Sequence, residues 1–307
     1  MYKTFSRQIQ WLASRVAVIY VVLFLFCITC IDLKTLDSRI KTRHLNDSIP
    51  DFSGMIHFSQ DQDPISPNDW KSYKYYFGLI LRYIPDDIVT RQLLGYVDYY
   101  TGHEEEAISL FKQSSMMQGR ILFWSNYNLG IIYYKKGMWP QAAGYFLSAI
   151  RSNLDLNLLL MQNSLVYKQI FANHYFKYSI NDEIHQAQSR AYILLLSSLH
   201  RMHQYEKMNL IFKIAMDNKD LSYKDAFYYY GGLSYLGMGQ AEKAFLLFQE
   251  SLNIEKNNPD VYYYIGNIYQ NVGELEKARN FLQASYVLHQ KNDPRFPYDN
   301  HLDLRFF

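Results

Sequence analysis

The sequence predicts an all-α fold, a solenoid of stacked helical hairpins preceded by an N-terminal transmembrane helix. Two observations carry this prediction. Residues 226–259 and 260–293 align without a gap, so that residues of the same kind recur 34 positions apart. A run without charged residues, 16–31, lies near the N-terminus. One hairpin cannot bury its apolar face alone, whereas stacked hairpins bury a continuous core.

The positions that coincide carry aromatic, small or glycine residues. They are Tyr228 with Tyr262, Gly232 with Gly266, Tyr235 with Tyr269, Gly239 with Gly273, Ala244 with Ala278, Phe248 with Leu282, and Ser251 with Ser285. Steps of four and three keep Tyr228, Gly232 and Tyr235 on one face of a helix. Gly239 stands where a short turn must reverse the chain. This period and order of residues resemble the tetratricopeptide repeat (TPR) family.

The resemblance implies a right-handed TPR-type α-solenoid over residues 85–292, with about six repeat slots. The slots are expected to begin near residues 88, 123, 157, 189, 225 and 259. Slot 157–188 lacks the Ala and Phe signature in its second half, so a degenerate repeat and an inserted irregular segment both remain open. A helix over 68–84, which Ser66 and Pro67 introduce, is expected to cover the first repeat.

The N-terminal region reads as a membrane anchor and a spacer. Residues 1–15 form a basic flank, 16–31 a transmembrane signal anchor and 32–67 a linker with Pro, Ser, Asp and Gly. A cleaved or lipidated signal and a buried helix are the alternatives for the apolar run. The anchor reading places the soluble part on the translocated, periplasmic or extracytoplasmic side. The tail, 293–307, either lies along the last repeat or leaves the end of the solenoid as a contact surface.

Composition and motifs argue against catalysis and nucleic-acid binding. The formal net charge is only +2, and the two cysteines, Cys27 and Cys30, both lie near the N-terminus. The sequence has no phosphate-binding loop, dinucleotide fingerprint, zinc-protease helix or serine nucleophile elbow. His200 and His203 lack a third ligand nearby in sequence and read as a surface pair. The sequence therefore predicts a non-enzymatic protein without cofactor or metal.

The resemblance also implies a partner-binding groove, because TPR proteins line their concave face with fixed positions of each first helix. Carried over to this chain, the groove residues are Gln92, Tyr96, Tyr99, Tyr100, Trp124, Tyr127, Tyr134, Tyr229, Tyr263, Asn267, Gln270 and Asn271. The set is neutral and rich in Tyr and amides, and Tyr offers rigid contact area with a polar end. It lacks the Lys, Asn and Arg clamp with which some TPR proteins grip a terminal carboxylate.

These features predict a membrane-anchored scaffold or assembly factor that binds protein subunits of a membrane or envelope complex. Binding is expected in the groove or along the edge of the solenoid. The alternative is a carbohydrate-binding or polysaccharide-export accessory protein, because Tyr, Trp, Asn and Gln also suit stacking on sugars and hydrogen bonding to hydroxyl groups.

Overall fold

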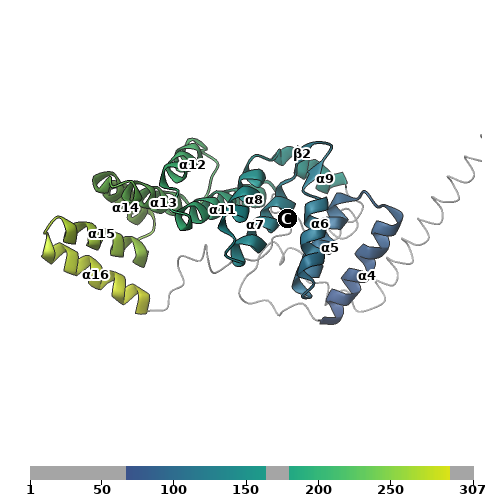
Figure 1. Ribbon diagram of the computed structural model, residues 1–307, viewed down its shortest axis with the longest axis horizontal. Coiled ribbons are helices and arrows are strands. Elements are labelled where there is room, and N and C mark those ends of the chain that lie inside the picture. The colour runs from purple at the N-terminus through teal and green to yellow at the C-terminus, as the bar shows by residue number, and fades with distance from the viewer. Residues whose placement is uncertain (1–66, 164–179, 291–307) are drawn as a thin grey trace, which may run out of the picture. The chain divides into compact units, whose positions relative to one another are not determined.

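The computed structural model describes residues 67–163 and 180–290, which form an all-α domain of helix–turn–helix repeats with one short β-ribbon (Figure 1). The predicted anchor at 16–31, most of the linker and the tail at 293–307 lie outside the described residues. Within the described residues, no helix is both long enough and apolar enough to span a bilayer.

The described helices follow one another as a covering helix, two hairpins, a separate helix and three further hairpins. In order they are α4 (Pro67–Tyr83), α5 (Ile88–Tyr100) with α6 (Glu104–Gln113), α7 (Phe123–Lys135) with α8 (Trp139–Ile150), α9 (Leu154–Asn163), α11 (Ile180–Arg201) with α12 (Tyr205–Asp217), α13 (Lys224–Gly237) with α14 (Ala241–Ile254), and α15 (Pro259–Asn271) with α16 (Leu275–Gln290). Helices α5, α7, α13 and α15 begin at or next to the positions that the repeat period predicts.

The second helix of each hairpin packs against the first helix of the next. These contacts join α6 to α7, α8 to α11, α12 to α13 and α14 to α15. The neighbour of α8 is therefore α11, and α9 does not take the place of a first helix. Helix α11 contains neither Gly nor Pro and begins at Ile180, so the slot start predicted at residue 189 falls inside it. The repeat array accordingly passes from α8 to α11, with α9 outside the stack.

Each regular hairpin is closed by an aromatic or aliphatic side chain that sits on a glycine of the partner helix. A Cβ atom on Gly232 would lie 2.5 Å from the Phe248 ring, and one on Gly130 would lie 2.5 Å from the Phe146 ring. Gly266 faces Leu282 in the same way, at 2.8 Å. Since a real Cβ atom would not fit at these distances, glycine at this position sets the close approach of the two helices.

The turns within the hairpins use a left-handed residue after the first helix. Gly102, Gly137, Gly239 and Gly273 all have positive φ. In the α11–α12 turn this place belongs to His203, whose φ is 55°. The N–H of the next residue, Gln204, donates to the Leu199 carbonyl at 2.9 Å, which closes the end of α11. A non-glycine residue therefore carries the same helix-ending motif at this one turn.

The loop between α6 and α7 holds a feature that the repeat pattern does not predict. Strands β1 (Met116–Met117) and β2 (Arg120–Ile121) pair antiparallel across Gln118 and Gly119. Both turn residues have positive φ, as a two-residue hairpin requires. The ribbon lengthens the link between the first two hairpins without entering the helical stack.

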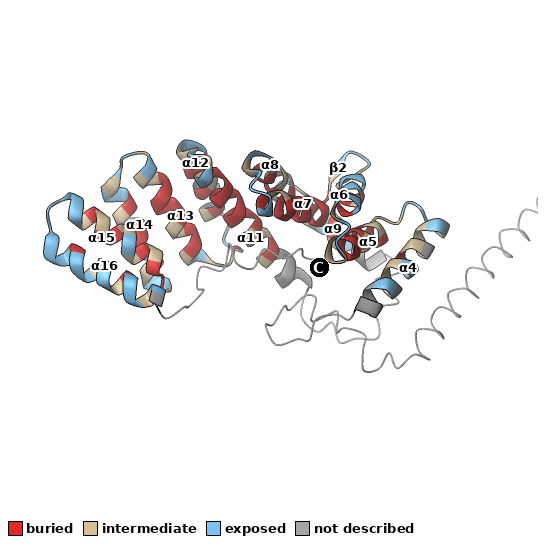
Figure 2. Cartoon of the chain, turned by 60° about the horizontal axis from the view of Figure 1, so that its bottom comes forward, coloured by how far each residue is buried: buried red, intermediate tan, exposed pale blue. Residues whose placement is uncertain are grey.

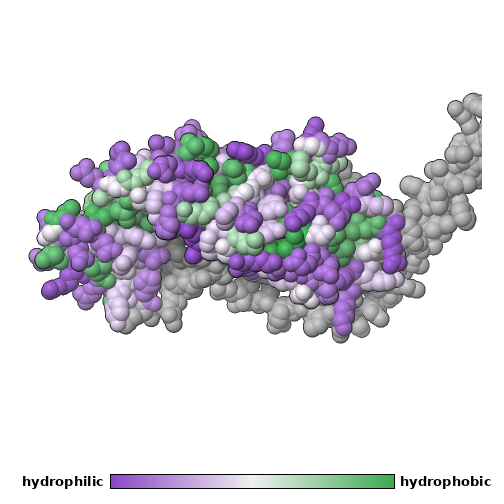
Figure 3. Space-filling model, viewed as in Figure 1, coloured by the Kyte–Doolittle hydropathy of each residue, from purple (hydrophilic) through white to green (hydrophobic). Residues whose placement is uncertain are grey.

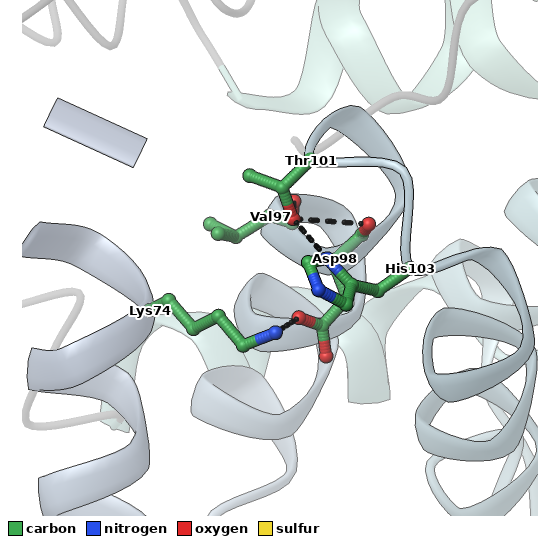
Figure 4. Close-up of polar contacts among 5 residues, drawn as sticks. All are labelled: Lys74, Val97, Asp98, Thr101 and His103. Carbon is green, nitrogen blue, oxygen red and sulfur yellow. Dashed lines mark hydrogen bonds and ion pairs between the residues drawn. The ribbon is translucent and has the colours of Figure 1, made fainter. Parts of the chain in front are cut away.

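Helix α4 covers the first hairpin through its contact with α5. Phe77 is buried, and Lys74 Nζ lies 2.7 Å from Asp98 Oδ1 (Figure 4). The Asp98 side chain is only 5% exposed. Asp98 occupies a first-helix position where the repeat pattern has Tyr, and the ion pair with α4 explains this departure. Thr101 completes the end of α5, since its hydroxyl donates to the carbonyls of Val97 and Asp98.

We expect Gly232→Ala to lower the free energy of unfolding by roughly 1–3 kcal/mol, because the new methyl group collides with the Phe248 ring. Gly144→Ala is the matched control. Gly144 lies in α8 with nothing within 4 Å of its missing Cβ, and a helical Gly→Ala change there is expected to be neutral or stabilising by up to about 1 kcal/mol. Chemical unfolding followed by circular dichroism measures both variants. Equal effects of the two substitutions would contradict this packing.

Candidate functional site

The structure divides the predicted groove into a buried and an accessible part. Five of its residues, all on α5 and α7, are at most 3% exposed. They are Gln92, Tyr96, Trp124, Tyr127 and Tyr134. Tyr99 and Tyr100, at the end of α5, are half-buried. Figure 2 shows α7 almost wholly buried, in contrast to α16. These five side chains are therefore not exposed in this structure, and their role in partner binding stays a prediction.

The buried part is an aromatic core within the first two hairpins. The Trp124 and Phe123 rings meet edge to face with centroids 5.0 Å apart. Tyr127 stacks on Phe123 at 5.6 Å and meets the Phe146 ring edge-on at 6.2 Å. Such pairs stabilise a core beyond the area that they bury. Tyr127, which the sequence placed on a recognition surface, thus contributes to the packing of the hairpins.

The polar ends of Gln92 and Tyr134 have hydrogen-bond partners in a neighbouring hairpin. Gln92 Nε2 on α5 donates to Ser125 Oγ on α7 at 2.7 Å. The Tyr134 hydroxyl on α7 lies 2.6 Å from Ser197 Oγ on α11 and accepts a hydrogen bond from Arg201 Nε at 3.3 Å. Buried polar groups need such partners, and each of these links two repeats.

Helix α9 is the element that the groove prediction did not include. It contacts α5, α7 and α11, the first helices of three successive hairpins. Asn157 of α9 is buried, and its Oδ1 accepts a 2.9 Å hydrogen bond from the backbone N–H of Phe123, the first residue of α7. A segment of the same chain therefore occupies part of the first-helix side of the N-terminal hairpins. The only sequence signal for this was the weak repeat slot after α8.

The accessible part of the predicted groove lies on α13 and α15. Tyr263 is 49% exposed, and Gln270 and Asn271 are also exposed. Tyr229 and Asn267 are half-buried. Tyr263, Asn267 and Gln270 follow steps of four and three, so they share one face of α15. We call the set Tyr229, Tyr263, Asn267, Gln270 and Asn271 the open face.

Tyr264 supports the open face although the groove pattern did not select it. Its ring lies 5.4 Å from that of Tyr263 and 6.2 Å from that of Tyr229, and it stacks on Phe248 at 5.6 Å. Burial, reinforced by the nearby charge of Asp260, raises the pKa of Tyr264 above its ordinary value. The phenol therefore stays neutral. The ring joins the open face to the core of the preceding hairpin and holds Tyr263 in place.

The open face offers uncharged contact chemistry. It combines aromatic rings with amide groups that donate and accept hydrogen bonds. In the described part of the chain, no three His, Cys, Asp or Glu residues lie close enough together to hold a metal ion. His203 Nδ1 is 2.8 Å from the Tyr205 hydroxyl, and His200 packs near the same ring. These two histidines belong to the α11–α12 turn and its surroundings.

Comparison with known proteins identifies the repeats. Residues 127–159 and residues 247–280 each match a family model described as a tetratricopeptide repeat. The first match covers most of α7, all of α8 and the start of α9, and the second runs from α14 into α16. No curated protein matches the chain.

Solved structures of MamA are similar to this chain. A crystal structure of MamA shares 18% identity, covers 65% of this chain and 96% of its own, and has a TM-score of 0.46. A MamA RS-1 double mutant shares 17% identity, covers 68% of this chain and 97% of its own, and has a TM-score of 0.48. A structure described as "MamA 41-end" from Desulfovibrio magneticus RS-1 shares 17% identity, covers 68% of this chain and 98% of its own, and has a TM-score of 0.46.

Two Tyr→Phe substitutions separate the buried from the accessible tyrosines. Tyr134→Phe removes a hydroxyl that bonds to Ser197 and Arg201, and we expect it to lower the free energy of unfolding by about 1–2 kcal/mol. Tyr263→Phe, at the exposed position, is expected to change stability by less than about 0.5 kcal/mol. Chemical denaturation of both variants decides the point. If Tyr263→Phe lowered the free energy of unfolding more than Tyr134→Phe, the assignment of Tyr134 as the buried tyrosine and Tyr263 as the exposed one would be contradicted.

Proposed function

We propose that this chain, which contains tetratricopeptide repeats, is a non-enzymatic scaffold that binds a segment of a partner protein on the open face of α13 and α15. The observation that carries the proposal is that Tyr263 and Gln270 of α15 are exposed, whereas the corresponding residues of α7, Tyr127 and Tyr134, are buried. TPR domains typically act as protein-interaction scaffolds, which supports a protein partner.

The chemistry of the open face favours an uncharged extended segment or one face of a helix. Tyr263 supplies a ring that packs on apolar side chains, and its hydroxyl remains a hydrogen-bond donor and acceptor. The amides of Gln270 and Asn271 suit backbone N–H and C=O groups of a bound segment. Since the Tyr263 ring already packs against Tyr264, little side-chain entropy is lost on binding.

The membrane forms part of the proposal. The apolar run at 16–31 would anchor the chain, with the repeats on the translocated side, and the linker would let them reach subunits in the same membrane. Tethering raises the effective concentration of the partner, so even a low affinity of the open face would be enough to form the complex. The role that this arrangement supports is assembly of a membrane or envelope complex.

A glycan ligand is the second candidate. The exposed Tyr263 ring is flanked along α15 by the side chains of Asn267 and Gln270, which is the combination that sugar stacking and hydroxyl recognition require. It differs from the protein-binding proposal in one testable respect. A glycan gives no protein adduct when a photoreactive group replaces Tyr263.

Site-specific photo-crosslinking tests the proposal. Benzoylphenylalanine replaces Tyr263 in the full chain, and native membranes are irradiated before analysis by gel electrophoresis and mass spectrometry. We expect one discrete adduct with a defined protein, which weakens when Gln270→Ala and Asn271→Ala are added, because these amides contact the same segment.

The matched control carries the photoreactive residue at Leu246, which is exposed on the second helix α14. It is expected to give no such adduct. The same adduct at both positions, or none at Tyr263, contradicts binding of a protein at the open face. In the second case, selective retention on immobilised glycans that Tyr263→Ala abolishes would favour the sugar ligand.

A further inference from the structure

The end of α16 lies beside the open face. Helix α16 is the second helix of the last described hairpin and returns along α15. His289, one residue before α16 ends, places its Nε2 atom 3.4 Å from Oδ1 of Asp260 in the first turn of α15. Asp260, Tyr263 and Asn267 follow steps of three and four, so they share one side of α15. The chain therefore leaves α16 where the side that carries Tyr263 begins.

The sequence that follows α16 contains two prolines three positions apart. Residues 291–298 read KNDPRFPY, with Pro294 and Pro297, and lie outside the described part of the chain. A residue before a proline is restricted to extended or polyproline conformations, so the sequence of 293–297 favours an extended segment. A polyproline II segment has three residues per turn and no internal hydrogen bonds. Both prolines would then lie on one edge of it, and its carbonyl groups would accept hydrogen bonds from outside.

The open face offers the groups that such a segment binds. Proline-rich segments are recognised in grooves lined by aromatic rings. Tyr263 is 49% exposed, and its ring packs edge to face on Tyr264 with centroids 5.4 Å apart. The side-chain amides of Asn267 and Gln270 are able to donate to backbone carbonyls. Figure 3 shows hydrophobic and hydrophilic residues interspersed over the end of the array that α15 and α16 form, in keeping with a ligand that carries both apolar and hydrogen-bonding groups.

The lengths of the tail and of the open face agree. Pro294 follows His289 by five positions, a stretch of chain that spans at most about 18 Å. Tyr263 lies only about 5 Å along α15 from Asp260, so the first proline reaches it. Two prolines three positions apart are about 9 Å apart in a polyproline II segment, and Tyr263 and Gln270 are about 10 Å apart along α15. A segment that follows α15 from its first turn therefore brings one proline to each of these two side chains.

The charges of the tail suit the same course. Lys291 is the first charged residue after α16, and it is opposite in sign to Asp260, beside which the tail begins. The five residues of the open face are uncharged, so they do not repel Asp293 or Arg295, which flank the first proline. The tail and the open face are thus compatible in spacing, hydrogen bonding and charge.

We propose that residues 293–298 of the same chain cover the open face, with Pro294 against Tyr263, and that a partner must displace them. This regulation acts on the site of the proposed function and rests on that function. A tethered segment has an effective concentration in the millimolar range, so a dissociation constant of about 1 mM keeps the face covered for about half of the time. Tyr263 stays accessible for the rest of the time, and partners that bind weakly are disfavoured.

Intramolecular photo-crosslinking tests the contact. The purified full chain carries benzoylphenylalanine at Tyr263 and is irradiated in mild detergent as an equal mixture of isotopically labelled and unlabelled copies. We expect mass spectrometry to find a crosslink from position 263 to residues 293–298 that joins peptides of the same label. Pro294→Ala with Pro297→Ala should reduce this crosslink by about threefold, because the segment loses both its ring contacts and its extended preference.

Two matched controls accompany this test. Leu302→Ala with Leu304→Ala changes the tail outside the proline segment and should leave the crosslink unchanged. The photoreactive residue at Leu246, which is exposed on α14, should give no crosslink to the tail. Mixed-label crosslinks would overturn the proposal, because the occupant would then be the tail of a second copy. No crosslink to 293–298, or one that the two proline substitutions leave unchanged, would overturn it as well.

Competition with the partner is measured separately in native membranes. The two proline substitutions should raise the partner adduct at position 263 by about twofold, because the tail no longer shares the open face. An unchanged adduct would contradict the competition. If the adduct forms but the tail crosslink does not, only this inference fails. If the adduct is absent with and without the prolines while the tail crosslink forms, the proposed partner binding fails instead.

Discussion

The hairpins depend on one contact, an aromatic ring of the second helix seated on a glycine of the first. Gly130 with Phe146 and Gly232 with Phe248 show it at the same separation in sequence, with no room for a Cβ atom. The contact brings the two helix axes close together and fixes which faces remain for the neighbouring repeats. The α11–α12 hairpin solves the same problem differently. Leu196 takes the place of the glycine, and Phe212 packs instead on Gly231 of the next hairpin.

This exception lies beside the place where the repeat order is interrupted. After α8 the chain forms α9, and α11 then takes the position that a first helix would occupy against α8. Helix α9 contacts three first helices and ties Asn157 to the start of α7. The groove positions Tyr96, Trp124, Tyr127 and Tyr134 of the N-terminal hairpins are buried, whereas Tyr263, Gln270 and Asn271 of α15 are exposed. The accessible part of the predicted groove among the described residues thus lies in the C-terminal hairpins.

The sequence predicted the parts of the fold that depend on local spacing. The starts of α5, α7, α13 and α15 and the glycine turns all follow from a period that is visible in the residues themselves. Whether Tyr96, Tyr127 and Tyr134 are buried or exposed was not predictable from this period. A first-helix side chain faces solvent only if no other segment covers it, and the repeat period of a sequence does not reveal such long-range contacts.

Two residues that depart from the repeat pattern, Asp98 and His203, have a structural role that the pattern does not predict. Asp98 stands where the pattern has Tyr, and the structure pairs it with Lys74 of the covering helix. His203 replaces a turn glycine and nonetheless adopts positive φ. For Asp98, a long-range ion-pair partner outweighs the residue preference of the repeat. For His203, the backbone conformation of the turn does so. A single sequence reveals neither.

The central claim is that the first-helix side of the array is closed in its N-terminal hairpins and open in its C-terminal hairpins. Hydroxyl-radical footprinting of the unmodified protein, read tyrosine by tyrosine by mass spectrometry, tests it most directly. The account predicts that Tyr263 is oxidised several times faster than Tyr96, Tyr127 and Tyr134. Equal oxidation of all four tyrosines would contradict it, because α9 and the aromatic core would then leave the N-terminal side open as well.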